Sequence, residues 1–227
     1  MTTLSEIKIK SQKHQLFVLG VLCILLAPLA LIFGLFGLET NPEGWYCSIS
    51  RTYHANSKVW MIGELFAISV YFLTYQGYDW RDRVLSIIQG IAAMGVAVFP
   101  CKIPNSSDPI GMFNLQPNVS QTLHIASTII LFVSFFISVT FLFTLSNGTI
   151  ANKKKIRNII YYVCGGLILF GMAGIVLDAL VLEKFIPNWF PTTMILEFTM
   201  LVPFGFAYMV KSGCFGFLND TYKEIQI

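Results

Sequence analysis

Charged residues are scarce in this sequence, and their scarcity argues against a soluble protein. Asp, Glu, Lys and Arg make up 12% of the 227 residues, whereas 55% of the residues are hydrophobic. A soluble domain carries about 25% charged residues. A chain with so little charge cannot cover a water-facing surface, so the composition predicts that the lipid bilayer is its solvent.

Local motifs of catalysis and metal binding are missing too. The sequence contains no CxxC, HExxH, GxSxG or phosphatase-type motif, and its five cysteines are spread thinly. Such motifs signal zinc sites, redox centres and serine hydrolases through the spacing of their ligands and nucleophiles. Without them, no reaction class is indicated by a short segment alone.

What the chain does have is a series of six long apolar stretches. They cover residues 15–38, 58–76, 83–101, 121–145, 157–180 and 190–212. Each is long enough, or nearly so, to cross a hydrocarbon core about 30 Å thick at 1.5 Å per helical residue. The sequence therefore predicts an all-α polytopic membrane protein, a bundle of six transmembrane helices in which residues 1–227 form one domain.

The basic residues are distributed unequally between the two sides of such a bundle. With the N-terminus inside, only four of the 15 Lys and Arg fall outside, namely Arg51, Lys58, Lys102 and Lys184, and eleven fall inside. The positive-inside rule then places both termini in the cytoplasm (N-in/C-in). The basic run at 153–157 is interpreted as an anchor at an anionic leaflet rather than a nucleic-acid site. The chain is short and shows no elaborate targeting segment, which favours a location in a bacterial inner membrane.

Four ionisable residues fall within the stretches, all toward their outer ends. Glu64 and Glu197 lie about two turns deep in the second and sixth stretches, while His124 and Asp178 lie within one turn of the outer surface. Such groups are costly in lipid, so each suggests a functional site. A simpler explanation exists for the two shallow residues: His124 at the interface, and Asp178 paired with a loop lysine.

These residues are predicted to share one outward-facing pocket. We expect Glu64, His124 and Glu197 to face one another, because mutual pairing or shared water is the least costly way to keep them in the membrane. The first outer loop adds polar groups above them. The full candidate set is Glu64, His124, Glu197, Asp178, His54, Ser48 and Ser50.

Three chemistries remain open for such a pocket. His124, Glu64 and Glu197 are suitable ligands for a divalent metal that activates water. A carboxylate–His–Ser arrangement would instead drive acyl transfer, with Ser48 or Ser50 as the nucleophile. In the third reading, the acids bind a proton or a cationic headgroup without catalysis.

Two cysteines are placed where a disulfide is feasible. Cys47 and Cys101 follow the first and third stretches, so both fall on the outer side. In an oxidising compartment a bond between them would pin the first loop over the pocket. Two unlinked thiols are the equal alternative.

Several short segments resemble the six-span DRAM/Sfk/Frag-type membrane protein family and similar bacterial membrane proteins. The segments are SISRTYH (48–54), VAVFP (96–100), LHIAS (123–127), KIRN (155–158) and ILEF (195–198). On this resemblance His124 and Glu197 occupy family-type positions, whereas Arg51 and Phe198 stand where the family has Asp and Trp. The resemblance implies lipid-related work without implying a reaction. Seven-span ceramidase-like hydrolases fit less well, because the last stretch contains no histidine.

The function we expect is lipid handling, meaning binding, remodelling or regulation, through an outward-facing polar pocket. Membrane lipids are the expected partners, and nucleic acid is not. A small transporter or channel that uses Glu64 and Glu197 as coupling acids is one alternative, although the inner half of the stretches looks apolar. A non-catalytic membrane scaffold is the other.

Overall fold

A computed structural model of the chain describes residues 4–36, 41–103, 106–146, 152–181, 185–187 and 189–220. The helices in this part are α1 (Leu4–Gly34), α2 (Lys58–Thr74), α3 (Trp80–Val98), α4 (Pro117–Ile137), α5 (Asn152–Leu180) and α6 (Thr192–Ser212). The π-helical turn η4 (Ser138–Leu142) continues α4. Three short 3-10 helices complete the fold: η2 (Trp45–Cys47), η3 (Ser50–His54) and η6 (Gly216–Leu218). Each predicted apolar stretch coincides with one of the α-helices.

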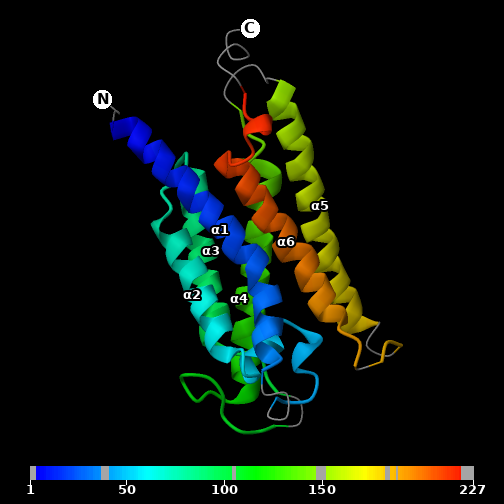
Figure 1. Cartoon of the computed structure of the whole chain (residues 1–227). Helices are drawn as coiled ribbons and strands as arrows, with labels where there is room; N and C mark the ends of the chain where they lie inside the picture. Colours follow the sequence, from blue (N-terminus) through cyan, green and yellow to red (C-terminus); the bar gives the residue numbers. More distant parts are fainter. Residues whose placement is uncertain are drawn as a thin grey trace.

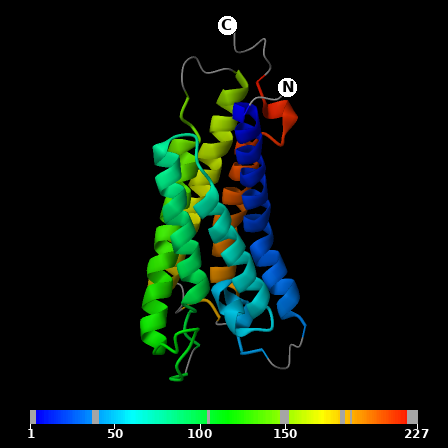
Figure 2. The same ribbon diagram turned by 90° about the vertical axis from the view of Figure 1, so that its left-hand side faces the viewer.

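The helices run side by side as one elongated bundle, seen from two directions in Figures 1 and 2. The start of α1 and the end of the described chain lie at the same end of it, which we call the terminal end. The connections between α1 and α2, between α3 and α4, and between α5 and α6 gather at the opposite end, here called the loop end. The described ends of the chain thus share one side.

The composition of the helices is that of a membrane protein. Within the described residues, four helical segments are long and apolar enough to cross a bilayer: Glu6–Gly34, Pro117–Leu142, α5 and α6. Helix α2 has only 17 residues, and α3 has 19 with charged residues in its first turn. The outward face of α5 is covered with large apolar side chains such as Ile159, Val163 and Phe170, each more than half exposed. Lipid is the solvent that such a surface requires.

Small residues bring the helix backbones close together. Helices α1 and α6 cross at Gly20 and Gly205, where a Cβ on Gly205 would lie 2.5 Å from the Gly20 carbonyl oxygen. No side chain fits there, and close approach of this kind is how membrane helices gain packing energy without a hydrophobic driving force between them. Helix α3 also has a face of small residues, Ser86, Gly90, Ala93 and Ala97, and all four are buried.

An aromatic layer fills the middle of the bundle. The rings of Phe135 and Phe204 stack with centroids 3.4 Å apart, and Phe72 and Tyr208 pack against them. Phe135 comes from α4, Phe72 from α2 and the other two from α6. The layer therefore ties together three helices that lie far apart in the sequence.

The expectation of an apolar inner half is wrong at one level. On the terminal-end side of the aromatic layer, Gln89 of α3 donates to Ser138 Oγ at 2.7 Å and to the Ser134 carbonyl at 3.1 Å, and it accepts from the Tyr208 hydroxyl at 3.2 Å. Gln89 is completely buried. This network satisfies its own members, as buried polar groups in lipid must.

Candidate functional site

The segment between α1 and α2 enters the loop end of the bundle instead of covering it. Most side chains of residues 45–57 are buried, including Trp45, Ile49, Thr52 and Tyr53. Non-helical backbone at this depth needs internal partners. The segment obtains them from its two 3-10 helices, in which Thr52 N donates to Ile49 O at 3.0 Å and Ala55 N to Thr52 O at 3.1 Å. It thereby delivers Ser50 to the bundle interior.

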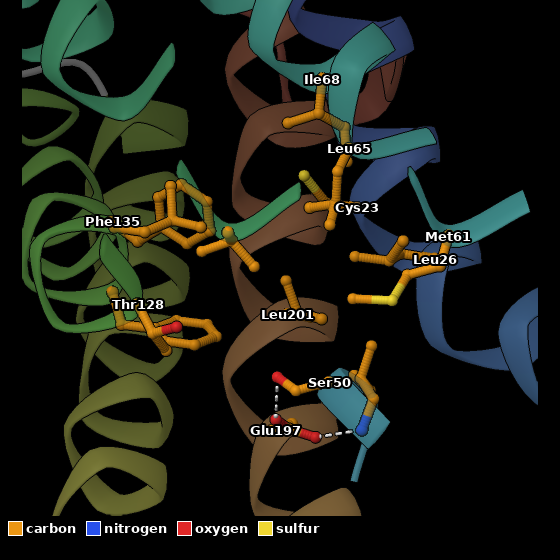
Figure 3. Close-up of a pocket in the computed structure, with 14 residues that line it drawn as sticks. Cys23, Leu26, Ser50, Met61, Leu65, Ile68, Thr128, Phe135, Glu197 and Leu201 are labelled. Atoms are coloured by element: carbon orange, nitrogen blue, oxygen red, sulfur yellow. Dashed lines mark hydrogen bonds between the residues drawn. The ribbon is translucent and has the colours of Figure 1, made fainter. Parts of the chain in front are cut away.

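Glu197 of α6 holds this segment in place. Its Oε2 accepts a 2.5 Å hydrogen bond from the backbone N–H of Ile49, and its Oε1 lies 3.4 Å from Ser50 Oγ. Figure 3 shows both bonds as dashed lines. The carboxylate is only 7% exposed. An acid predicted as a pocket residue thus bonds the backbone of a loop almost 150 positions away.

His124 of α4 completes a contact with the same serine. Its Nε2 lies 2.9 Å from Ser50 Oγ, and its Nδ1 lies 2.7 Å from the carbonyl oxygen of Phe99. A carbonyl only accepts, so Nδ1 carries the ring proton and the neutral ring presents Nε2 as an acceptor. The Ser50 hydroxyl then donates to His124. This is the arrangement of a serine beside a base that a third group orients.

A second histidine ties the segment to the end of α3. His54 Nε2 donates to the Cys101 carbonyl at 2.6 Å. Burial of the ring lowers the pKa of His54, although the hydrogen bond to Cys101 acts in the opposite direction and the nearby Lys58 adds to the lowering. The His54 ring is therefore neutral, and its hydrogen bond links η3 to the segment that follows α3.

The disulfide considered from the sequence is not formed in this structure. Cys101 keeps its thiol, whose Sγ donates to the Ser50 carbonyl at 3.3 Å, and no bond joins it to Cys47. Burial raises the pKa of the Cys101 thiol to about 12, so the group keeps its proton at neutral pH. The loop is fixed by hydrogen bonds where a covalent bridge was considered.

Glu64 does not join His124 and Glu197. Its Oε2 accepts from Trp60 Nε1 at 2.9 Å, one turn earlier on the same helix, and its buried Oε1 has no hydrogen-bond partner. The predicted three-way cluster is thus reduced to two members. The described residues also contain no group of three or more His, Cys, Asp and Glu side chains arranged to hold a metal, so the metal set of His124, Glu64 and Glu197 is not assembled.

The two remaining candidates take separate places. Asp178 of α5 accepts from Thr193 Oγ1 at 3.2 Å near the loop end. Ser48 is buried, and its Oγ accepts from the backbone N–H of Arg51 at 3.1 Å. Ser48 therefore stabilises the start of η3, which leaves Ser50 as the serine that reaches the histidine.

Two spaces of different character meet at η3. A wide cavity of about 780 Å³ opens at the loop end, and Arg51, Asp178, Tyr46 and Trp189 are among the residues that line it. On the bundle side of the segment lies a narrow cavity with about 40 Å³ of free space, shown in Figure 3. Ser50 and Glu197 line the narrow cavity, while the next residue, Arg51, lines the wide one.

The narrow cavity is apolar apart from a few groups. Leu65, Leu131, Phe135 and Leu201 are typical of its walls. A further polar wall residue is Thr128 of α4, whose buried hydroxyl has no hydrogen-bond partner. Since a water needs about 10–15 Å³, the space holds a few waters or a short apolar group.

Comparisons of this chain with models of known families, with curated proteins and with solved structures find no match. The case for function therefore rests on the geometry of the site. Sequence reasoning identified Ser50, His124 and Glu197 as candidates but missed three partners: the Ile49 amide, the Phe99 carbonyl and the Thr128 hydroxyl. Backbone groups carry no residue-type signal, and a lone threonine in an apolar helix is unremarkable in sequence.

Proposed function

We propose that this chain is an integral membrane protein that handles lipid through a pocket at its outer face. In this proposal all six helices span the membrane, both termini are cytoplasmic and the loop end faces outward, in a bacterial inner membrane. The excess of basic residues on the terminal-end side supports this orientation. The resemblance to a lipid-related six-span family points the same way.

The observation that carries the proposal is the junction of two unlike spaces at η3. A membrane lipid has a polar headgroup, ester or amide linkages and then apolar chains. The wide cavity offers a cation at Arg51, an anion at Asp178 and aromatic surface at Trp189 for a headgroup. The narrow cavity offers apolar walls for a short length of chain, with Ser50 and Thr128 among the few polar groups that line it. Ligand pockets combine apolar walls with a few polar groups in this way.

A transporter fits this arrangement less well. Along α6 the order of side chains is Glu197, Leu201, Phe204 and Tyr208, and the stacked rings of Phe135 and Phe204 lie between the outer site and the buried network around Gln89. A polar path across the membrane would have to pass through that packing. A pure scaffold fits less well too, because it gives no reason for a cavity with an unpaired hydroxyl.

Photocrosslinking tests the proposal. The purified protein is placed in nanodiscs of phosphatidylethanolamine and phosphatidylglycerol that include a phospholipid with a diazirine on its acyl chain. We expect crosslinks to the walls of the narrow cavity, such as Leu65 and Leu131, above those to the lipid-facing surface. Leu201→Trp fills the cavity and should remove these crosslinks selectively.

The matched control is Leu177→Trp, the same substitution at an outward position that is 50% exposed. It should leave the cavity crosslinks unchanged. Crosslinks confined to the outer surface of the bundle, with no effect of Leu201→Trp, would show that lipid does not enter and would overturn the proposal.

A further inference from the structure

We propose that Ser50 and His124 are the nucleophile and the general base of a hydrolase that cleaves acyl esters of membrane lipids. The inference rests on the proposed lipid-handling function and adds a reaction to it. The pair comes from η3 and α4, 74 positions apart in the sequence. Ser50 lines the narrow cavity, and the next residue, Arg51, lines the wide one.

The geometry satisfies the requirements of an activated serine. The 2.9 Å separation of Ser50 Oγ and His124 Nε2 is within the reach of proton transfer. The 2.7 Å bond from Nδ1 to the Phe99 carbonyl fixes the ring orientation and the tautomer in which Nε2 is free to accept. This carbonyl takes the orienting role that a carboxylate plays in the usual triad.

Most serine and threonine hydroxyls elsewhere in the described bundle donate to backbone carbonyls. Ser134 and Thr199 donate to carbonyls of their own helix, at Leu131 and Leu196, while Ser69 and Ser86 donate to the Gly90 and Phe72 carbonyls of the neighbouring helix. Hydroxyls in membrane helices ordinarily bond in this way. Ser50 Oγ differs in lying 2.9 Å from a ring nitrogen of α4, to which it donates its one proton, and 3.4 Å from a carboxylate oxygen of α6.

The reaction proceeds in two balanced steps. Ser50 Oγ attacks the ester carbonyl carbon and passes its proton to His124 Nε2. The tetrahedral intermediate collapses, the bond from carbon to the alcohol oxygen breaks, and His124 returns the proton to the leaving alcohol. Water then attacks the acyl-Ser50 ester, again with His124 as base, and the carboxylic acid leaves as Ser50 recovers its proton. The net reaction is ester plus water to acid plus alcohol.

Two further side chains have roles around the reacting atoms. The unpaired Thr128 hydroxyl is a free donor in the same cavity, suited to bind the ester carbonyl oxygen. Glu197 is a positioning residue, because it holds the Ile49 amide and so places the adjacent Ser50. The wide cavity, lined by the adjacent Arg51, is the proposed source of the water for the second step.

The first test asks whether Ser50 is chemically activated. A fluorophosphonate probe is added to the protein in nanodiscs, and the modified residue is located by mass spectrometry. We expect modification of Ser50, its loss in Ser50→Ala, and a fall of about 10²-fold or more in the labelling rate in His124→Gln. Ser48→Ala is the matched control, since Ser48 is a buried neighbour that contacts only the Arg51 amide in this site, and it should still be labelled at Ser50.

Folding of each variant is checked by thermal unfolding and by size-exclusion chromatography. If Ser50→Ala fails to fold, Ser50→Cys keeps the shape and should move reactivity from the fluorophosphonate to iodoacetamide at position 50. The labelling rate of the wild-type protein should fall as acidification protonates the base. A rate that does not depend on pH, or modification away from Ser50, would overturn the assignment.

The second test separates reaction from binding. The same nanodiscs are assayed for fatty acid released from phosphatidylethanolamine and phosphatidylglycerol, beside the diazirine crosslinking. We expect release by the wild-type protein and none by Ser50→Ala, which should still be crosslinked. Crosslinking without release by the wild-type protein refutes hydrolysis and leaves lipid binding standing. No crosslinking in the cavity refutes the proposed function itself.

Discussion

Glu197 is the residue that links the stability of the site to its activity. Its carboxylate is the acceptor for the buried Ile49 amide and also contacts the hydroxyl that His124 contacts. Glu197→Ala should destabilise the protein by about 1–3 kcal/mol, because a buried donor is left without a partner. Thermal unfolding in detergent measures this loss.

Glu197→Gln is the informative companion. The amide oxygen can still accept from Ile49, so the fold should be retained, but an NH2 group replaces the carboxylate oxygen that lies 3.4 Å from the Ser50 hydroxyl. We expect Ser50 labelling and lipid turnover to be abolished while the protein remains folded and inserted. Full activity in Glu197→Gln would show that the carboxylate serves only to hold the loop.

His54 gives a pH-dependent contribution to stability. Burial lowers its pKa below the ordinary value of 6.5 in the folded protein, so the folded state favours the neutral ring. Stability from this group is full above about pH 6.5 and is lost as the pH falls from there through the lowered value, by at most about 1.4 kcal/mol per pH unit. Unfolding midpoints between pH 7.5 and 5 measure it. His54→Gln should flatten the curve, whereas His14→Gln, at an exposed position, should not.

The residues also show which part of the site could be predicted. Depth follows from the ends of an apolar stretch, and His124 and Glu197, expected at one level, both lie within 3.4 Å of Ser50 Oγ. Rotation about the helix axis does not follow, and this is why Glu64 was wrongly grouped with them: it pairs along its own helix with Trp60. Ser50 was selected only as one of two serines, since the backbone bonds that distinguish it from Ser48 leave no trace in residue type.

At the scale of elements, apolar stretches predicted the helices well and the connecting segment poorly. All six stretches are helical, although α1 and α5 begin at residues 4 and 152, ahead of the predicted 15 and 157. Polar residues continue a helix beyond the hydrocarbon core, so hydrophobicity marks only part of it. The segment with η2 and η3 looked like a surface loop, because its burial depends on Glu197, which is distant in sequence.

The crossing of α1 and α6 yields a test at this scale. Gly205→Ala places a Cβ about 2.5 Å from the Gly20 carbonyl, so the helices must separate. Overpacking of this kind costs about 1–3 kcal/mol. The control is Gly166→Ala in α5, where nothing lies within 4 Å of the added Cβ and where alanine should be neutral or stabilise by up to about 1 kcal/mol. Thermal unfolding measures both effects. Equal unfolding midpoints for Gly205→Ala and Gly166→Ala would contradict the close packing of α1 and α6.

For the molecule as a whole, function follows from layers along the bundle axis. A polar open cavity at the loop end is followed by the narrow apolar cavity, the aromatic layer and the buried network around Gln89. The wide cavity opens at the loop end. The orientation of the bundle decides on which side of the membrane the loop end lies. It therefore also decides whether the proposed substrates come from the outer or the inner leaflet.

Reporter fusions decide the orientation. The excess of basic residues at the terminal end predicts that a fusion after Lys223 is active as a cytoplasmic reporter, and that one after Lys102, beyond an odd number of spans, is active as a periplasmic reporter. If the two reporters gave the opposite signals, the bundle would have the inverted orientation, and the Ser50 site would face the cytoplasmic leaflet. Equal sidedness of the two fusions would mean that α4, α5 and α6, the three helices between the two fusion points, do not all cross. In the predicted orientation, the proposed substrates are lipids of the outer leaflet.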